Sequence, residues 1–385
     1  MKKILYATQS IDSADLKAVK LALRSACLTQ GPIVDEFEET VARFCGAGYA
    51  VAVNSGTSAL HIACMAAGIG GGDEVITSPN TFVASSNSIL YCGGKPVFAD
   101  IMEDNAVIDP SDIERKITKR TRAVIPVDFA GHPADMKEIK ELADKHGLII
   151  IEDAAHALGA KYRGSRVGSG KYADMTILSF HAVKHITTGE GGMVLTNDKK
   201  LYQLLRKLRT HGITRDPKML NRERGDWYYE MSALGYNYRL TDIQCALGIS
   251  QLKKLPAFLK KRREIVRRYD EFFAKTGYAA PLAAREYVDH AYHLYVIRLK
   301  LEDLRVSRRV VFDEYRKAGI MVNVHYIPVY SQPYYRNLGF RKGICPGAEK
   351  YYDEALTLPL HPGLSKTDID RVISVTGKIF DKYGK

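Results

Sequence analysis

The chain has 385 residues, of which 46% are hydrophobic and 26% are charged. These proportions are typical of a globular enzyme, and no apolar run approaches the roughly 20 residues that a membrane span needs. The formal net charge is +12, but the basic residues are interleaved with acidic ones, without the basic stripe and aromatic residues typical of nucleic-acid binding. We therefore expect a protein that acts on small molecules and binds neither nucleic acid nor a membrane.

The cysteines and the start of the chain indicate the compartment. The six cysteines stand far apart and form no C-x-x-C pair, which argues against a metal site and favours reduced thiols. The first residues turn polar at Thr8-Gln9-Ser10, before an apolar signal core forms. These features predict a cytoplasmic protein.

Hydrophobic periodicity predicts two helices, over 11–24 and 34–44, followed by an alternation of strands and helices up to residue 208. Such alternation is typical of a mostly parallel sheet covered by helices. The long polar loop at 213–227 has a length that usually signals function or mobility. The predicted strands are 49–54, 74–77, 96–99, 123–127, 148–151, 175–178 and 193–196.

A different pattern of strands and helices follows a long predicted helix at 243–273. Strands at 293–299 and 321–326, with helices at 307–318 and 369–383, indicate a smaller α+β unit. We expect a large α/β domain at residues 1–255 and a small C-terminal domain at 256–385.

An acid and an amine follow two of the predicted strands. Strand 148–151 leads into Glu152 and Asp153, and strand 175–178 leads into Ser179 and then Lys184. Because parallel strands end at one edge of a sheet, the carboxylate and the amine are expected to meet there. Pyridoxal 5′-phosphate (PLP) needs this pairing, since an amine forms an imine with its aldehyde and an anion keeps its ring nitrogen protonated.

A phosphate seat is predicted where Ser55-Gly56-Thr57-Ser58 opens the helix after strand 49–54. Free backbone amides and the helix dipole favour an anion at such a position. Gly56 allows close backbone approach, and the hydroxyls of Thr57 and Ser58 add donors.

Several strings together resemble the sugar aminotransferases of the DegT/DnrJ/EryC1/StrS family, and the resemblance runs nearly end to end. They are Asp153-x-x-His156, Ser179-x-x-x-x-Lys184, Gly189-Glu190-Gly191-Gly192, the S-G-T-S turn at Ser55 and Gly235-Tyr236-Asn237-Tyr238-Arg239. The resemblance implies PLP fold-type I, related to aspartate aminotransferase, with a mostly parallel seven-stranded sheet. It also implies a homodimer with shared active sites, in which Asn237 and Arg239 serve the partner's site.

The motifs and the family resemblance together give the candidate site residues. Phe82 resembles the family residue that stacks on the ring, and His325 lies in a segment that resembles one folding over the substrate. The candidates for catalysis are Lys184, Asp153 and His156; those for cofactor binding are Gly56, Thr57, Ser58, Phe82, Asp153, His156, Ser179, Lys184 and Asn237; those for substrate binding are Tyr6, Leu28, Thr29, Gln30, Gly31, His185, Tyr229, Arg239 and His325.

The segments around Tyr6, Leu28, Lys184 and Tyr229 look most like the branch that makes the 4-amino intermediate of pseudaminic acid. The resemblance implies L-glutamate as donor, a UDP-linked 4-keto-6-deoxy-N-acetylhexosamine as acceptor, and pyridoxamine phosphate between the half-reactions. Two positions depart from the pattern: His185 replaces the common proline after the lysine, and Asp128 stands where many relatives have histidine.

Two alternatives to this function remain open. A sibling enzyme would aminate a different 3-keto or 4-keto nucleotide sugar. A protein of another class would bind PLP without turnover, as a regulator. Relatives that dehydrate sugars have histidine in place of the lysine, so Lys184 argues against that activity.

Overall fold

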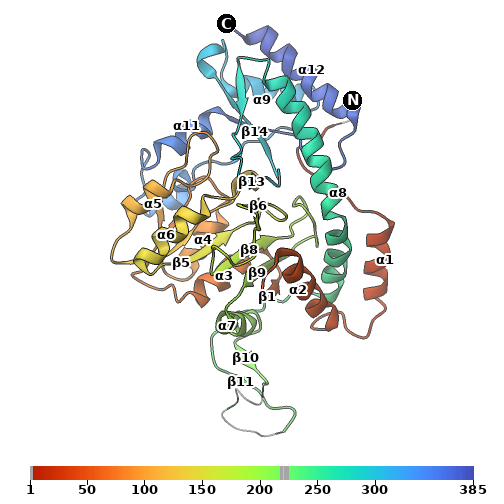
Figure 1. The fold of residues 1–385 in the computed structure, drawn as a ribbon, viewed down its shortest axis with the longest axis vertical. Coiled ribbons are helices and arrows are strands. Elements are labelled where there is room, and N and C mark those ends of the chain that lie inside the picture. Colours follow the sequence, from red (N-terminus) through yellow and green to blue (C-terminus); the bar gives the residue numbers. More distant parts are fainter. Residues whose placement is uncertain (1–2, 217–219, 221–224) are drawn as a thin grey trace.

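The computed structural model describes residues 3–216, 220 and 225–385 (Figure 1). Its centre is a seven-stranded sheet with the order β1-β9-β8-β5-β4-β2-β3. Strand β9 runs antiparallel to both of its neighbours, and the other six strands share one direction. The predicted mostly parallel sheet is therefore confirmed. Its strands are β1 (Tyr49–Val53), β2 (Glu74–Thr77), β3 (Lys95–Phe98), β4 (Thr121–Ile125), β5 (Ile149–Asp153), β8 (Met175–Ser179) and β9 (Gly192–Thr196).

Both faces of this sheet are apolar. In β1, Ala50 and Ala52 belong to one hydrophobic cluster, and Val51 and Val53 belong to another. Because successive side chains of a strand point to opposite faces, this division shows that helices bury the sheet on both sides, as parallel sheets require.

The helices follow from local signals as well as from packing. Ser55 accepts a hydrogen bond from the backbone N–H of Ser58 and so starts α3 (Gly56–Ala66), which packs on β1, β8 and β9. Thr241 and Gln244 form a capping box at the start of α8 (Asp242–Phe273), which runs from the large sheet into the C-terminal region (Figure 1). The preceding helices are α1 (Ser13–Ala22), α2 (Pro32–Cys45), α3 (Gly56–Ala66), α4 (Ala84–Tyr91), α5 (Pro110–Lys116), α6 (Met136–His146) and α7 (Lys199–Arg209).

The C-terminal region has a core of its own. The antiparallel strands β12 (Ala279–Pro281), β14 (Tyr295–Leu299) and β15 (Ala355–Leu358) form its sheet. Ile4 packs into the same hydrophobic cluster, so the first part of the chain returns to this region. The boundary expected after residue 255 falls inside α8 and stays a prediction. The remaining helices are α9 (Arg308–Lys317), α10 (Pro333–Asn337), α11 (Pro346–Glu354) and α12 (Lys366–Tyr383).

The strand predicted at 321–326 is wrong. This segment forms an isolated bridge, between Asn323 and Thr357, but no strand. Side-chain oxygens take its backbone donors: Val324 N–H donates to Asn323 Oδ1, and Tyr326 N–H donates to Asn80 Oδ1. Local and side-chain acceptors of this kind compete with strand pairing.

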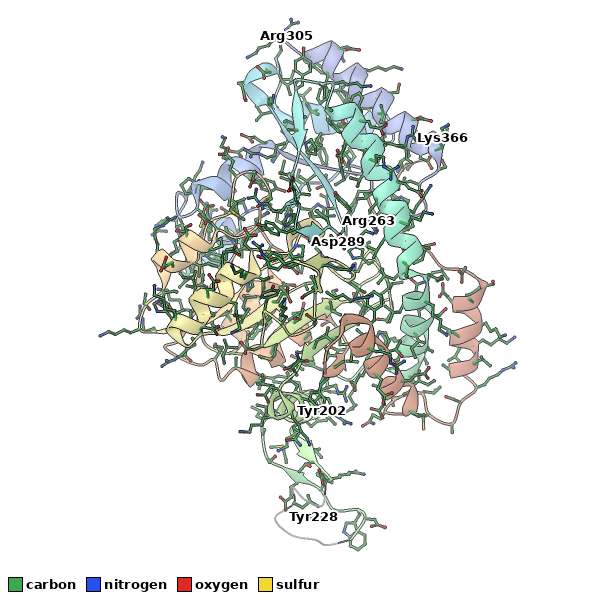
Figure 2. The ribbon with its side chains drawn as sticks, in the orientation of Figure 1. Tyr202, Tyr228, Arg263, Asp289, Arg305 and Lys366 are labelled. Atoms are coloured by element: carbon green, nitrogen blue, oxygen red, sulfur yellow. The ribbon has the colours of Figure 1, made fainter. Side chains whose placement is uncertain are left out.

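Two smaller sheets complete the fold. Strands β10 (Ile213–Thr214) and β11 (Glu230–Met231) form a hairpin that projects from the body, with Tyr228 beyond its strands (Figures 1 and 2). Of the loop predicted at 213–227, residues 217–219 and 221–224 lie outside the described residues. Strands β6 (Lys161–Tyr162), β7 (Ser165–Arg166) and β13 (Val288–Asp289) form the other sheet. Among the described residues, no helix is long and apolar enough to cross a membrane.

Candidate active site

Two adjacent parallel strands deliver the acid and the amine to one edge of the large sheet. Asp153 is the last residue of β5, Ser179 is the last residue of β8, and the two strands pair directly. The loop after β8 carries Lys184. Ligand sites of open α/β sheets lie at the carboxyl ends of their strands, which is where these groups meet.

A cavity of about 670 Å³ opens at this edge. That volume suits a small organic ligand. Nine of the candidate residues line it: Tyr6, Gly56, Thr57, Phe82, Asp153, His156, Ser179, Lys184 and His325.

The Asp153 carboxylate is buried but well supported. Its Oδ2 accepts a hydrogen bond from Ser85 Oγ at 2.6 Å, and its Oδ1 accepts one from the N–H of Ala155 at 3.2 Å. Burial raises the pKa of this carboxyl, while both hydrogen bonds and the Lys184 charge act in the opposite direction. A cationic ring nitrogen beside Asp153 would oppose the effect of burial in the same way.

Burial also changes the Lys184 amine. It lowers the pKa of Lys184 to about 8, although the Asp153 carboxylate favours the charged form. A much larger fraction of this amine is therefore neutral at physiological pH than for an exposed lysine. A neutral lysine can attack an aldehyde and can accept a proton.

The residues of the expected phosphate seat lie between the start of α3 and the end of β8. A Cβ atom on Gly56 would lie 3.2 Å from Ser179 Cβ, so glycine lets the helix start approach the Ser179 hydroxyl. Thr57 lines the same part of the cavity. Ser58 does not line it, because its hydroxyl donates to Asn54 Oδ1 at 2.6 Å. The helix amides and the two hydroxyls form a suitable anion seat.

His156 and Phe82 present the remaining groups that a PLP ring requires. His156 is buried, its Nε2 lies 3.4 Å from Tyr326 Oη, and its Nδ1 has no hydrogen-bond partner among the described residues. Burial, together with the Lys184 charge, holds the pKa of His156 well below the ordinary histidine value. The Phe82 side chain is 60% exposed and lines the cavity, so its ring is open to a ligand. The residues present fit the cofactor.

The other candidates lie outside this cavity. His185 is buried beside it, with Nε2 at 3.0 Å from the Ala291 carbonyl oxygen, so the expected substrate contact is absent from this cavity. Loop 28–31 packs on the start of α8, where the Gly31 N–H donates to Asp242 Oδ2 at 2.9 Å. The remaining candidates away from the cavity are Leu28, Thr29, Gln30, Tyr229, Asn237 and Arg239.

The cavity also contains polar side chains that were not among the candidates, and three of them are Ser85, His293 and Tyr326. The signal for Ser85 was its position three residues after Phe82, since residues that far apart share one side of a helical turn. His293 and Tyr326 come from the C-terminal region, and no local pattern assigns them to this sheet edge.

Two curated relatives match over nearly their whole length. The Bacillus subtilis spore coat polysaccharide biosynthesis protein SpsC is 42% identical over 380 residues, which cover 97% of this chain and 96% of SpsC. The UDP-4-amino-4,6-dideoxy-N-acetyl-beta-L-altrosamine transaminase of Campylobacter jejuni is 40% identical over 385 residues, which cover 99% of both chains.

Solved structures agree with this match. Helicobacter pylori PseC, an aminotransferase involved in the biosynthesis of pseudoaminic acid, has a TM-score of 0.92 and 34% identity, covering 99% of this chain and 100% of PseC. Spr1654 from Streptococcus pneumoniae was solved in PMP and PLP forms, each with a TM-score of 0.91. The PMP form is 34% identical and the match covers 98% of this chain; the PLP form is 33% identical and the match covers 99% of this chain. Both matches cover 99% of Spr1654.

A family model also matches almost the entire sequence. It is the model of the DegT/DnrJ/EryC1/StrS aminotransferase family, and it matches residues 9–376. The fold, the cavity and these comparisons agree: the chain belongs to the DegT/DnrJ/EryC1/StrS family, and it is a PLP-dependent sugar aminotransferase of fold-type I.

Proposed function

We propose that this enzyme moves an amino group from L-glutamate to the C4 keto carbon of a UDP-linked 4-keto-6-deoxy-N-acetylhexosamine, in the pathway to pseudaminic acid. The observation that carries the proposal is the cavity that Lys184 and Asp153 both line. The sugar is supported by the names of the Campylobacter jejuni transaminase and of PseC.

The residues of the cavity have separable tasks in this reaction. When bound, PLP supplies an aldehyde that takes up the amino group and a ring that withdraws electrons. Asp153 holds positive charge at the ring nitrogen, and Lys184 Nζ moves the proton at the reacting carbon of donor or acceptor. The start of α3 with Thr57 and Ser179 would hold the phosphate. Phe82 would cover a face of the ring, and His156 would serve the phenolic oxygen.

We propose that a second copy of the chain completes each site. Asn237 is exposed and lies on the surface near the hairpin, outside the cavity of its own chain. Gln30, Gly31 and Arg239 line a separate basic hollow of about 490 Å³ with Arg206 and Arg215. Amide and guanidinium donors suit the phosphate and substrate anions of a partner's cavity. In this arrangement Leu28, Thr29 and Tyr229 contact the partner's substrate.

A different 3-keto or 4-keto nucleotide sugar remains the competing substrate, because SpsC, named for spore coat polysaccharide biosynthesis, is 42% identical to this chain. Product analysis with a panel of 3-keto and 4-keto nucleotide sugars separates the two. Amination of only the UDP-linked 4-keto-6-deoxy-N-acetylhexosamine supports the proposal, and exclusive amination of another sugar contradicts it.

Replacing Lys184 tests whether its amine drives turnover. In Lys184→Ala, we expect the glutamate half-reaction to fall by at least about 100-fold, since a positioned base contributes that much or more. Cofactor retention through the phosphate seat should persist. The change in visible absorption after adding glutamate measures the rate. Lys119→Ala, which removes an exposed lysine, is the control; normal turnover by Lys184→Ala would show that another residue holds this role.

The lowered pKa of Lys184 gives a pH prediction. Burial favours the neutral amine, so the reactive fraction rises with pH and levels off above about 8. The rate at which cofactor-free protein takes up added PLP should therefore drop about tenfold per pH unit below that value, since one protonation controls it. Stopped-flow absorbance measures this rate. A rise that continues to the ordinary lysine pKa of about 10.4 would refute the assignment.

Mixed dimers test the shared site. Lys184→Ala and Asn237→Ala protomers, each nearly inactive alone, should regain activity when they are unfolded and refolded together. Random pairing gives about a quarter of the wild-type number of intact sites, because half of the dimers are hybrids with one intact site each. Steady-state rates of the mixture measure this recovery. Absence of recovery, with hybrid dimers demonstrated by differential tagging, would place Asn237 in its own chain's site.

A further inference from the structure

Segment 236–239 carries Asn237 and Arg239, which we place in the partner's site. It lies beside the end of α7, the helix that leads into the projecting hairpin (Figure 1). The Tyr238 N–H donates to the carbonyl oxygen of Arg209, the last residue of α7, at 3.0 Å. Since the backbone is held in this way, the direction of the side chains decides which site the segment can serve.

Two tyrosine rings stack on one side of this segment. The ring centroids of Tyr236 and Tyr238 are 4.9 Å apart, and the ring planes differ by 15°. The residue between them, Asn237, forms an antiparallel bridge with Thr210, so the backbone is extended there. Successive side chains of an extended segment point to opposite sides. The exposed Asn237 side chain therefore points away from the two stacked rings.

The side chain of His61, from the second turn of α3, holds both rings. Its Nδ1 forms a hydrogen bond of 3.0 Å with Tyr238 Oη. Its ring meets the Tyr236 ring edge-on, with the centroids 4.9 Å apart at an angle of 60°. His61 is only 5% exposed, so water competes little for these contacts. One side chain of α3 thus contacts both residues that flank Asn237.

Asn54, two residues before α3, holds the same segment through its backbone. The Asn54 N–H donates to the Tyr238 carbonyl oxygen at 2.8 Å. The Asn54 side-chain oxygen accepts a hydrogen bond from Ser58 Oγ at 2.6 Å, which directs its amide nitrogen toward the Asn237 carbonyl oxygen at 3.5 Å. Segment 236–239 is therefore attached to the start of α3 as well as to its second turn.

We propose that His61 is a positioning residue for the partner's active site: by holding the two tyrosines against α3, it directs Asn237 toward the phosphate of the partner's cofactor. This inference rests on the proposed sharing of sites between two copies of the chain. His61 itself lies outside the cavity of its own chain. Helix α3 would then serve two sites, its own through the first turn and the partner's through His61.

The first test measures PLP binding by the full-length, cofactor-free protein. In His61→Ala we expect the Kd for PLP to rise at least about tenfold, because Asn237 loses its fixed position and with it a hydrogen bond to a charged phosphate. His61→Asn should recover most of the affinity, since its amide lies near the position of Nδ1 and can donate or accept. Absorbance titration measures the Kd.

The matched control for this titration is His146→Ala, which removes an exposed histidine from the end of α6. Its Kd for PLP should equal that of the unsubstituted protein. An equal Kd in His61→Ala as well would overturn the proposal.

Mixed dimers show which chain's site depends on His61. His61→Ala and Lys184→Ala protomers, refolded together, form hybrids in which the intact lysine site receives Asn237 from a chain that keeps His61. At limiting PLP, activity should therefore recover to about a quarter of the wild-type value, since half of the dimers carry one intact site. His61→Ala with Asn237→Ala should show no recovery, because neither hybrid site receives a correctly placed Asn237.

A purely structural role predicts the reverse pattern. If His61 only supports α3 within its own chain, His61→Ala recovers activity with Asn237→Ala and not with Lys184→Ala, and this result would overturn the proposal. The pair Lys184→Ala and Asn237→Ala tests the shared site separately. If that pair does not recover, the shared site itself is refuted, and the role of His61 falls with it.

If His61→Ala does not fold, Tyr238→Phe replaces it. This variant removes the same hydrogen bond from the other side and keeps the stack on Tyr236. The Kd for PLP should rise about fivefold, in line with the loss of one neutral hydrogen bond, and activity should recover with Lys184→Ala only. Recovery with Asn237→Ala, or an unchanged Kd, would contradict the proposal.

Discussion

The placement of one half-buried amine and one buried carboxylate at the same sheet edge is the constraint on which this structure depends. Strands β5 and β8 are adjacent, parallel and apolar, so Asp153 and the Lys184 loop emerge together. Removal from water makes both charged forms costly. The amine responds with a pKa lowered to about 8, and the carboxylate with hydrogen bonds from Ser85 and the Ala155 N–H.

The sheet was predictable because its signals are local. Each strand is a short apolar run between polar or glycine-containing segments, and Asp153 and Lys184 follow two such runs. The alternation of strands and helices implies that such strands are neighbours in one sheet. Sequence reasoning therefore found the edge, the acid, the amine and the helix start at Gly56.

The remaining features depend on contacts that no window of sequence contains. Segment 321–326 has a strand pattern, yet Asn80, far away in the chain, takes the Tyr326 N–H. His185 follows Lys184 directly, yet its ring turns to Ala291. Arg262 stands in the run Lys260-Lys261-Arg262-Arg263, a pattern typical of a solvent-exposed helix face, yet it is one of the most buried side chains among the described residues. Tertiary packing decides each of these cases.

The arrangement of charge gives the cavity its chemical character. Lys184 and Asp153 are the ionisable pair at its centre, and the pKa values of His156, His293 and His325 all lie below the ordinary histidine value because these rings are buried. The histidines thus supply hydrogen-bonding nitrogens without adding charge. A cationic ring held in such a site meets a single carboxylate, which is the condition for an efficient electron sink.

The most direct measurement is a crystal structure of the purified protein loaded with PLP. The account predicts continuous electron density between Lys184 Nζ and the aldehyde carbon, with the Asp153 carboxylate at hydrogen-bond distance from the ring nitrogen and the phosphate at the start of α3. Density for the cofactor bonded to another residue, or a ring nitrogen that faces away from Asp153, would contradict it.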